Sequence, residues 1–250
     1  MHSVLRMQEE GDDTMNGNIL ITGAKMVLPT GIETGDLRIS SGVISEISTS
    51  GHLEPLEGEM VHDANGMHLL PGGIDPQVHF REPGQEFKED LASGSAAAAS
   101  GGITSFLDMP NNKPPATTLE SIEDKIASAN AKCITNFGFF IGATPDNLDE
   151  LQRAVGTPEN GVAHPGICGI KIFMGSSTGD LLVHETAHLE NIFANTAGLI
   201  AVHAEDENRL NERFEQMKHR TDIAAHAEWR DDITALNATD LAVNMAKQTN

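Results

Sequence analysis

The sequence predicts an α/β protein that contains an incomplete (β/α)₈ barrel with a small β unit in front of it. After residue 71, apolar strand-like runs alternate with helical segments, as in parallel sheets joined by right-handed crossovers. Polar residues directly follow several of these runs, as they do at the catalytic ends of barrel strands. About five strands can be counted in residues 71–250, against the eight of a closed barrel. We therefore expect only the first part of a barrel.

The first 70 residues divide into a polar tail and a β-rich segment. Residues 1–17 are acidic and rich in Gly and Met, which leaves too little apolar surface to order them, so we expect a disordered tail. Residues 18–70 hold short β-type stretches separated by Gly, Asn and Asp turns, a pattern typical of a small antiparallel sheet. The remaining residues, 71–250, are the expected barrel domain.

The barrel domain contains five candidate strands, each apolar on both faces, as a parallel strand inside a helical shell should be. They are expected at residues 73–80, 103–109, 136–143, 167–173 and 199–204. Helices are expected at residues 91–102, 119–131, 147–155 and 186–197, and a last helical region covers much of 205–248. A candidate helix thus follows each candidate strand, which is the repeating unit of a barrel.

Composition restricts the partners of the protein. The 250 residues carry 16 basic and 37 acidic side chains, a formal net charge of −21. Phosphate binding needs clustered Lys and Arg, so neither a nucleic acid nor an anionic membrane is an expected partner. The two cysteines lack CxxC spacing, and no apolar run approaches the roughly 18 residues of a membrane span. We expect a soluble protein of the reducing cytoplasm.

The segment PGGIDPQVHFREPG, residues 71–84, holds the first candidate site. Side chains alternate along a strand, so Gln77 and His79 are expected on one face. Two histidines at this spacing commonly hold a divalent metal, but the first position here is Gln, and a lone His after a strand is more often a hydrogen-bonded structural residue. The guanidinium of Arg81 suits a substrate carboxylate, with a surface salt bridge to Glu82 or Glu86 as the alternative.

Two further candidates belong to the fourth and fifth apolar runs. Lys171 lies inside an apolar run, where an ammonium is costly unless it is neutralised or paired. Two interpretations stay open: a lysine of lowered pKa that forms a metal-bridging carbamate with carbon dioxide, and a lysine whose ammonium reaches solvent at the strand end. The GSSTG segment after it is expected to be a flexible active-site loop. His203 ends the fifth run and is a candidate imidazole ligand.

The motifs FREPG, DMPNN, GIKIFMGSSTG and VHAEDE, together with the helical stretch RDDITALNATDLAV, resemble bacterial dihydroorotases of the amidohydrolase superfamily. The resemblance covers essentially the whole chain from residue 17. It implies a (β/α)₈ TIM-type barrel and a small β-sandwich domain whose second half would come from a C-terminal segment absent here. It also implies zinc-dependent, reversible hydrolysis of L-dihydroorotate to N-carbamoyl-L-aspartate in pyrimidine biosynthesis, with a small-molecule substrate.

The resemblance also assigns roles to individual residues. It implies that His79, Lys171 and His203 hold one or two zinc ions, with Lys171 as a bridging carboxylated lysine. Arg81 and Asn111 match the residues that grip the free carboxylate of the substrate. The general-base Asp of the family would lie beyond Asn250, the last residue of the sequence. No catalytic residue is therefore assigned, and we expect the 250-residue chain alone to be inactive.

One residue departs from the family pattern, because Gln77 stands where the family has its first His ligand. An amide oxygen is a poorer zinc donor than imidazole, so one metal position should be weakened. A second interpretation is another cyclic-amide hydrolase, such as a hydantoinase or allantoinase, in which Arg81 would have less purpose. A third is a non-catalytic scaffold for aspartate transcarbamoylase, favoured by Gln77 and opposed by Lys171, His203 and Arg81. Two protein partners stay open: a second copy of the chain, in a homodimer, and aspartate transcarbamoylase.

Overall fold

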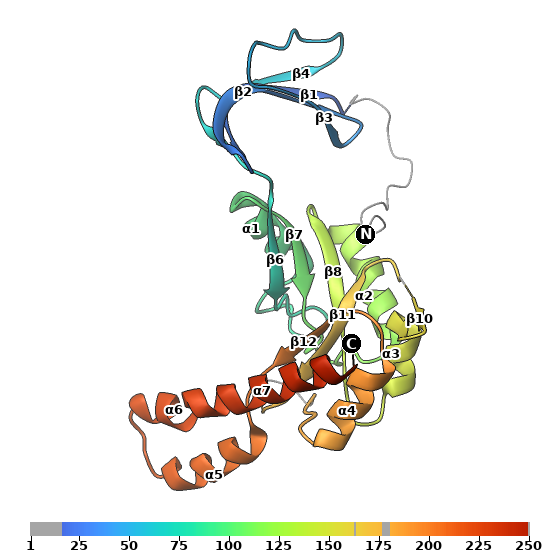
Figure 1. The fold of residues 1–250 in the computed structure, drawn as a ribbon, viewed down its shortest axis with the longest axis vertical. Helices are drawn as coiled ribbons and strands as arrows, with labels where there is room; N and C mark the ends of the chain where they lie inside the picture. The colour runs from blue at the N-terminus through green and yellow to red at the C-terminus, as the bar shows by residue number, and fades with distance from the viewer. Residues whose placement is uncertain (1–16, 163, 177–180, 250) are drawn as a thin grey trace. The chain divides into compact units, whose positions relative to one another are not determined.

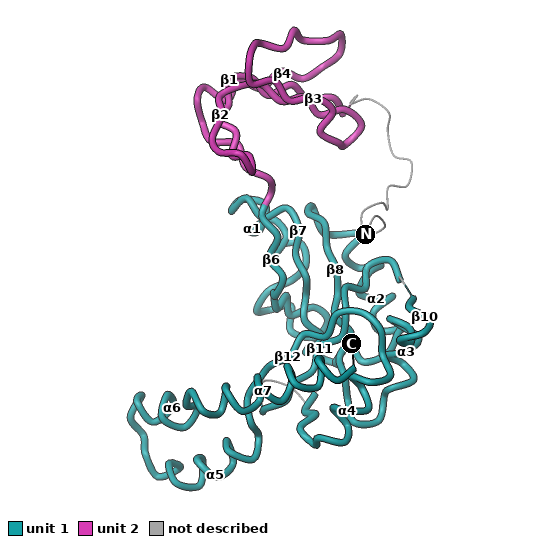
Figure 2. The backbone as a smooth tube through the Cα atoms, viewed as in Figure 1, with its two compact units in different colours: residues 1–5, 73–250 teal, residues 6–72 magenta. Residues whose placement is uncertain are grey.

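The computed structural model of the protein describes residues 17–162, 164–176 and 181–249. These residues form two compact units, and the boundary lies between Gly72 and Gly73 (Figure 2). The tail expected at residues 1–17 lies outside the described residues except for Gly17. The GSSTG loop also lies mostly outside them, because residues 177–180 are not described, and so does Asn250.

The N-terminal unit is one sheet in the order β3-β2-β1-β4, with β5 also paired to β1. The strands are β1 (Ile19–Leu28), β2 (Gly31–Ser40), β3 (Val43–Ser48), β4 (Met60–Asp63) and β5 (His68–Leu69). The first three are antiparallel, as expected, but β4 and β5 run parallel to β1, which corrects the expectation of a purely antiparallel sheet. The reason is the connection of residues 49–59, which crosses from β3 to the far edge of β1. Arg38 on β2 holds this connection through a 2.7 Å ion pair with Glu59.

The second unit is built around a five-stranded sheet in the order β12-β11-β8-β7-β6 (Figure 1). The strands are β6 (Gly73–Val78), β7 (Ile103–Asp108), β8 (Asn136–Gly142), β11 (Ile167–Phe173) and β12 (Ile200–His203). All neighbours in the sheet are parallel, and their order in the sheet follows their order in the chain. The expected α/β fold with an incomplete (β/α)₈ barrel is confirmed.

Helices connect the strands in the barrel-like unit. They are α1 (Leu91–Ser100), α2 (Leu119–Lys132), α3 (Leu148–Val155), α4 (Thr186–Asn195), α5 (Glu207–Met217), α6 (Ala224–Trp229) and α7 (Asp232–Thr249). Asp90 and Thr118 cap α1 and α2, because their side chains accept hydrogen bonds from backbone N–H groups of the first turn. The pair β9 (Gly156–Thr157) and β10 (Asn160–Gly161) forms a short hairpin after α3. The last helical region expected from the sequence is divided into three helices.

The core of this unit lies where the central strands meet the helices. Phe106, Phe139, Ile141 and Ile170 are fully buried there. The edge strand β6 differs, since Ile74 is 66% exposed. This corrects the expectation that every strand is apolar and buried on both faces, and the cause is that β6 pairs with one neighbour only among the described strands. Within the described ranges, no helix is both long and apolar enough to cross a bilayer.

Candidate functional site

The carboxyl ends of the five parallel strands lie at one edge of the sheet, and the candidate residues come from four of them (Figure 1). His79 directly follows β6, and Asn111 lies in the loop after β7. Lys171 lies inside β11, and His203 is the last residue of β12. Because β6 and β12 are the two outer strands of the sheet, His79 and His203 lie at its opposite ends. This edge is where barrel enzymes place their chemistry.

At the β6 end, His79 and Asn111 contact each other directly. Nδ1 of His79 lies 2.7 Å from Oδ1 of Asn111, so the ring donates from Nδ1 and keeps its lone pair on Nε2. Burial lowers the pKa of His79, and the positive charges of Arg81 and Lys171 lower it further, while the bond to Asn111 opposes the shift. A neutral imidazole with a bare Nε2 is the form that binds metals.

Arg81 lies close enough to His79 for its charge to act on the imidazole. Among the residues that the structure describes, no carboxylate lies within ion-pair distance of its guanidinium. Glu82 pairs instead with Lys132, and Glu86 accepts a hydrogen bond from the backbone N–H of Gly84. The salt bridges that the sequence offered as an alternative for Arg81 are therefore not formed. A half-buried cation without a carboxylate partner in the described ranges can bind an anionic group of a substrate.

A buried ion pair that sequence reasoning missed joins the segments carrying His79 and Asn111. Nζ of Lys125, on α2, lies 2.7 Å from Oδ2 of Asp108 and 2.7 Å from Oδ1 of Asn112. The other oxygen of Asp108 accepts from the backbone N–H of Phe80 at 2.9 Å. Burial raises the pKa of Asp108, while Lys125 and the N–H of Phe80 oppose the rise. A charged residue between the buried Ile122 and Ala129 of α2 was the available signal.

The carboxylate of Glu82 forms a second anchor next to the first. It accepts hydrogen bonds from the backbone N–H of Leu91 and the hydroxyl of Ser128, each at 3.0 Å, and pairs with Lys132. The side chain of Asn112 donates to the backbone oxygen of Glu82 at 2.9 Å. The loop that carries Arg81 is thus tied to α1, to α2 and to the end of β7.

Lys171 is buried on β11, the neighbour of the outer strand β12, with an exposed fraction of 2%. Its backbone pairs with Gly142 on one side and Ala201 on the other. Burial lowers the pKa of its amine, and in the described part of the chain no acidic group is paired with it. Its Nζ lies 5.2 Å from the centre of the Phe173 ring. A lysine that reaches solvent at the strand end does not fit this burial.

At the β12 end, His203 is half-buried and is held by a carboxylate. Its Nε2 lies 2.5 Å from Oε2 of Glu205, and the same oxygen pairs with Arg230. The ring centre of His203 lies 5.9 Å from that of Phe173, the residue opposite it in β11. Sequence reasoning identified His203 but not Glu205 or Arg230, because Arg230 is 25 residues away from Glu205 along the chain.

The donor atoms fit part of a metal site. Two half-buried imidazoles and a buried amine are groups that bind zinc once the amine is carboxylated. No cluster of three or more His, Cys, Asp or Glu side chains with metal-binding geometry occurs in residues 17–162, 164–176 and 181–249. Gln77 is exposed and His79 is half-buried, and the pairing of β6 with β7 shifts register between Asp75 and Val78. The shared face expected for Gln77 and His79 stays a prediction.

The general base is the one member of the expected site without an assigned residue. The resemblance placed the general-base Asp of the family beyond Asn250, and Asn250 itself lies outside the described residues. The position of this Asp therefore stays a prediction. Among the residues discussed above, Asp108 is not a substitute for it, because both of its oxygens are bound within the protein, one by Lys125 and one by the backbone N–H of Phe80.

Residues 184–188 read His-Glu-Thr-Ala-His, which has the H-E-x-x-H spacing of zinc proteases. That motif needs both histidines on one helix, one turn apart. Here α4 begins at Thr186, so His184 lies before the helix. Its Nε2 lies 3.3 Å from the exposed carboxylate of Glu185, the residue that would be the general base. The context that this motif requires is absent, and we assign it no role.

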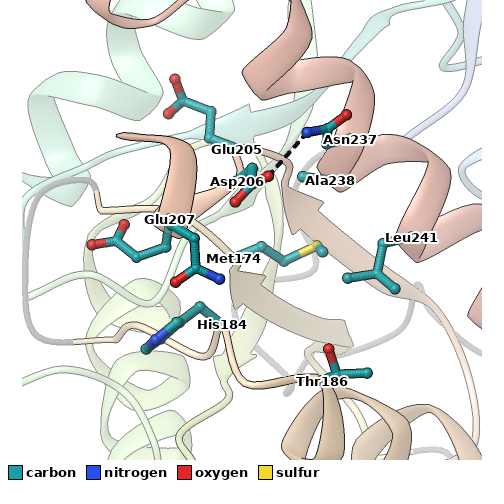
Figure 3. Close-up of a pocket in the computed structure, with 10 residues that line it drawn as sticks. Met174, His184, Thr186, Glu205, Asp206, Glu207, Asn237, Ala238 and Leu241 are labelled. Atoms are coloured by element: carbon teal, nitrogen blue, oxygen red, sulfur yellow. Dashed lines mark hydrogen bonds between the residues drawn. The ribbon is translucent and has the colours of Figure 1, made fainter. Parts of the chain in front are cut away.

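A cavity of about 170 Å³ lies beside the end of β11, between the loop after β12 and helices α4 and α7 (Figure 3). Asp206 and Asn237 face each other in it, joined by a 3.0 Å hydrogen bond. Glu207 is bound to the backbone and hydroxyl of Ser176. Asp206 and Glu207 thus bind α7 and the loop after β11, and we place the candidate active site at His79, Asn111, Lys171 and His203 instead.

Comparison with known proteins identifies the family of the chain. Residues 68–244 match the model of the amidohydrolase family. An allantoinase from Deinococcus radiodurans is 34% identical over 247 residues, which is 94% of this chain and 52% of that protein. A dihydroorotase from Methanosarcina acetivorans is 33% identical over 232 residues, 91% of this chain and 47% of that protein. The chain spans about half the length of these curated relatives.

Solved structures agree with this result. An L-hydantoinase from Arthrobacter aurescens superposes with a TM-score of 0.78 at 25% identity, over 92% of this chain and 51% of its own. A dihydropyrimidinase from Brevibacillus agri has a TM-score of 0.76 at 26% identity, over 93% of this chain and 50% of its own. The parallel sheet, the strand-end residues and these matches lead to one conclusion: the chain belongs to the amidohydrolase family.

Proposed function

We propose that the chain is part of a zinc-dependent hydrolase of cyclic amides, and that its substrate is L-dihydroorotate, opened reversibly to N-carbamoyl-L-aspartate. The observation that carries the choice of substrate is Arg81. Its charge lowers the pKa of His79, and it has no ion-pair partner among the described residues. Dihydroorotate has a free carboxylate that would fill this role, whereas hydantoin and allantoin are uncharged rings.

His79, Lys171 and His203 would hold the metal. The burial that lowers the pKa of Lys171 favours the neutral amine, whose lone pair can form a bond to carbon dioxide while the nitrogen loses a proton. The resulting carbamate would be an anionic oxygen donor on β11, between β8 and β12. Zinc bound there would supply Lewis-acid polarisation of the ring carbonyl of the substrate.

The polypeptide contributes orientation at the β6 end. Lys125, Asp108 and Glu82 fix the loop through buried hydrogen bonds, so Arg81 and His79 keep their spacing before a substrate binds. A preorganised charge loses little free energy when the substrate carboxylate arrives. The carboxylate would be held by Arg81, next to the imidazole of His79.

Allantoin hydrolysis is the second candidate. It is favoured by the match to the allantoinase from Deinococcus radiodurans, which is at least as similar as the dihydroorotase. The two candidates differ in what Arg81 does, because only dihydroorotate brings a carboxylate to it. A comparison of ligands therefore separates them.

The test is calorimetric binding of dihydroorotate, allantoin and hydantoin to the zinc-loaded protein. Arg81→Met should weaken dihydroorotate binding by about 1.5 to 3 kcal/mol, the scale of a charge-assisted hydrogen bond, and should leave the two uncharged ligands nearly unaffected. The matched control is Arg153→Met, since Arg153 is an exposed partner of Glu150 on α3. An equal loss for all three ligands, or preferred binding of allantoin by the wild type, would replace our proposal with the second candidate.

A further inference from the structure

The two histidines at the ends of the sheet use opposite ring nitrogens for their hydrogen bonds. His79 uses Nδ1, which contacts Asn111, whereas His203 uses Nε2, which contacts Glu205. We propose that Glu205, held by Arg230, is a positioning residue that keeps His203 protonated at Nε2 and so leaves Nδ1 as its lone-pair nitrogen. Only the purpose of this arrangement, which is to present Nδ1 of His203 to a metal, rests on the proposed function.

The contact between His203 and Glu205 is within hydrogen-bond distance. Nε2 of His203 and Oε2 of Glu205 lie 2.5 Å apart. A carboxylate accepts and does not donate, so the proton of a neutral His203 lies on Nε2. The Phe173 ring, whose centre lies 5.9 Å from that of His203, flanks the imidazole.

Arg230 holds Glu205 in place from a distant part of the chain. It lies between α6 and α7 and pairs with the same oxygen that accepts from His203. A second nitrogen of Arg230 donates to the backbone oxygen of Ser176 at 2.7 Å. Arg230 therefore connects three places: the end of β12, the loop after β11 and the start of α7.

A second His–Glu pair in the same unit lacks the arginine that holds Glu205. Nε2 of His184 lies 3.3 Å from Glu185, but that carboxylate is 70% exposed and has no arginine partner among the described residues. Glu205 has an exposed side-chain fraction of 16% and has one. Glu185 is therefore a matched control: the same residue types at similar spacing, without the arginine.

The test uses the metal-free protein labelled with ¹⁵N in histidine. Long-range ¹H–¹⁵N correlation reports which ring nitrogen carries the proton, and His203→Asn identifies the signal of His203. In the wild type we expect protonated Nε2, bare Nδ1 and an Nε2–H proton that exchanges slowly with water. Glu205→Leu should speed that exchange at least tenfold, and Arg230→Met should do so to a smaller degree. Glu205→Gln keeps an oxygen acceptor and should restore slow exchange, whereas Glu185→Gln should change nothing.

Two outcomes would overturn the proposal: a wild-type His203 protonated at Nδ1, or an exchange rate that does not change in Glu205→Leu. Fluorescence of Trp229, the single tryptophan, checks that each variant is folded. Zinc affinity is a separate readout, and we expect Glu205→Leu to weaken it about 10- to 100-fold, as loss of a partner of a metal-bound histidine does. Wild-type protein that shows the expected His203 signals but binds no zinc would contradict the proposed function and leave the role of Glu205 intact.

Discussion

The two ends of the candidate site are held in different ways. At the β6 end, the ion pair of Lys125 and Asp108 is almost completely removed from solvent, with exposed side-chain fractions of 2% and 0%. At the β12 end, Glu205 and Arg230 remain 16% and 21% exposed. A charge that loses its partner in the interior stays uncompensated, whereas one near the surface is solvated again. The β6 end should therefore depend on its ion pair for folding, and the β12 end should depend on it mainly for the orientation of His203.

Removal of the buried lysine should have the largest effect. Lys125→Met should lower the free energy of unfolding by about 3 to 5 kcal/mol, because it leaves the carboxylate of Asp108 buried without a counter-charge. Urea unfolding followed by the fluorescence of Trp229 measures this, since Trp229 belongs to the barrel-like unit. The double variant Lys125→Met with Asp108→Leu should recover part of the loss.

Arg230→Met is the matched comparison at the other end. Because Arg230 and Glu205 are partly solvated, this variant should cost about 1 kcal/mol or less in the same experiment. Equal losses in Lys125→Met and Arg230→Met would remove the distinction between the two ends.

Glu82 gives a pH-dependent test of the buried end. Burial alone would raise its pKa, but the N–H of Leu91, Lys132 and Ser128 together lower it below the ordinary value. A carboxyl whose pKa is lower in the folded state contributes stability above its unfolded pKa and loses it as the pH falls through the folded pKa. Glu82→Gln should thus cost about 1 to 3 kcal/mol at pH 7, and the difference from wild type should shrink as the pH falls below about 4. A difference that stays constant with pH would show that Glu82 does not act as an ion.

Gln77→His tests whether Gln77 weakens metal binding at the β6 end. We expect a smaller effect than in the variants above. Imidazole is a better zinc donor than an amide, so the variant should retain more zinc per protein after dialysis than the wild type. His203→Gln in both backgrounds serves as the control, because it should lower zinc content whatever stands at position 77. If wild type and Gln77→His retain equal zinc, position 77 is not a ligand position, in line with its exposed side chain.

The sequence predicted the five strands of the barrel-like unit because apolar runs and the polar residues after them are local patterns. His79, Lys171 and His203 could be selected in the same way, each from its place at or near a strand end. The residues that orient these three side chains could not be selected in this way, because they are far from their partners in the sequence and contact them only in the folded protein. Lys125 reaches Asp108 across α2 and β7, and Arg230 reaches Glu205 from beyond α6. The direction of β4 was missed for a related reason, since it depends on the path of a connection and not on the strand itself.

We propose that Lys171, a buried amine of lowered pKa, is carboxylated by carbon dioxide. The most direct measurement is the ¹³C spectrum of the protein incubated with ¹³C-bicarbonate and zinc. We predict a carbamate carbon resonance that is present in the wild type and in the exposed control Lys247→Arg, and absent in Lys171→Arg. A wild-type spectrum without this resonance, or a resonance that persists in Lys171→Arg, would contradict the carboxylation of Lys171.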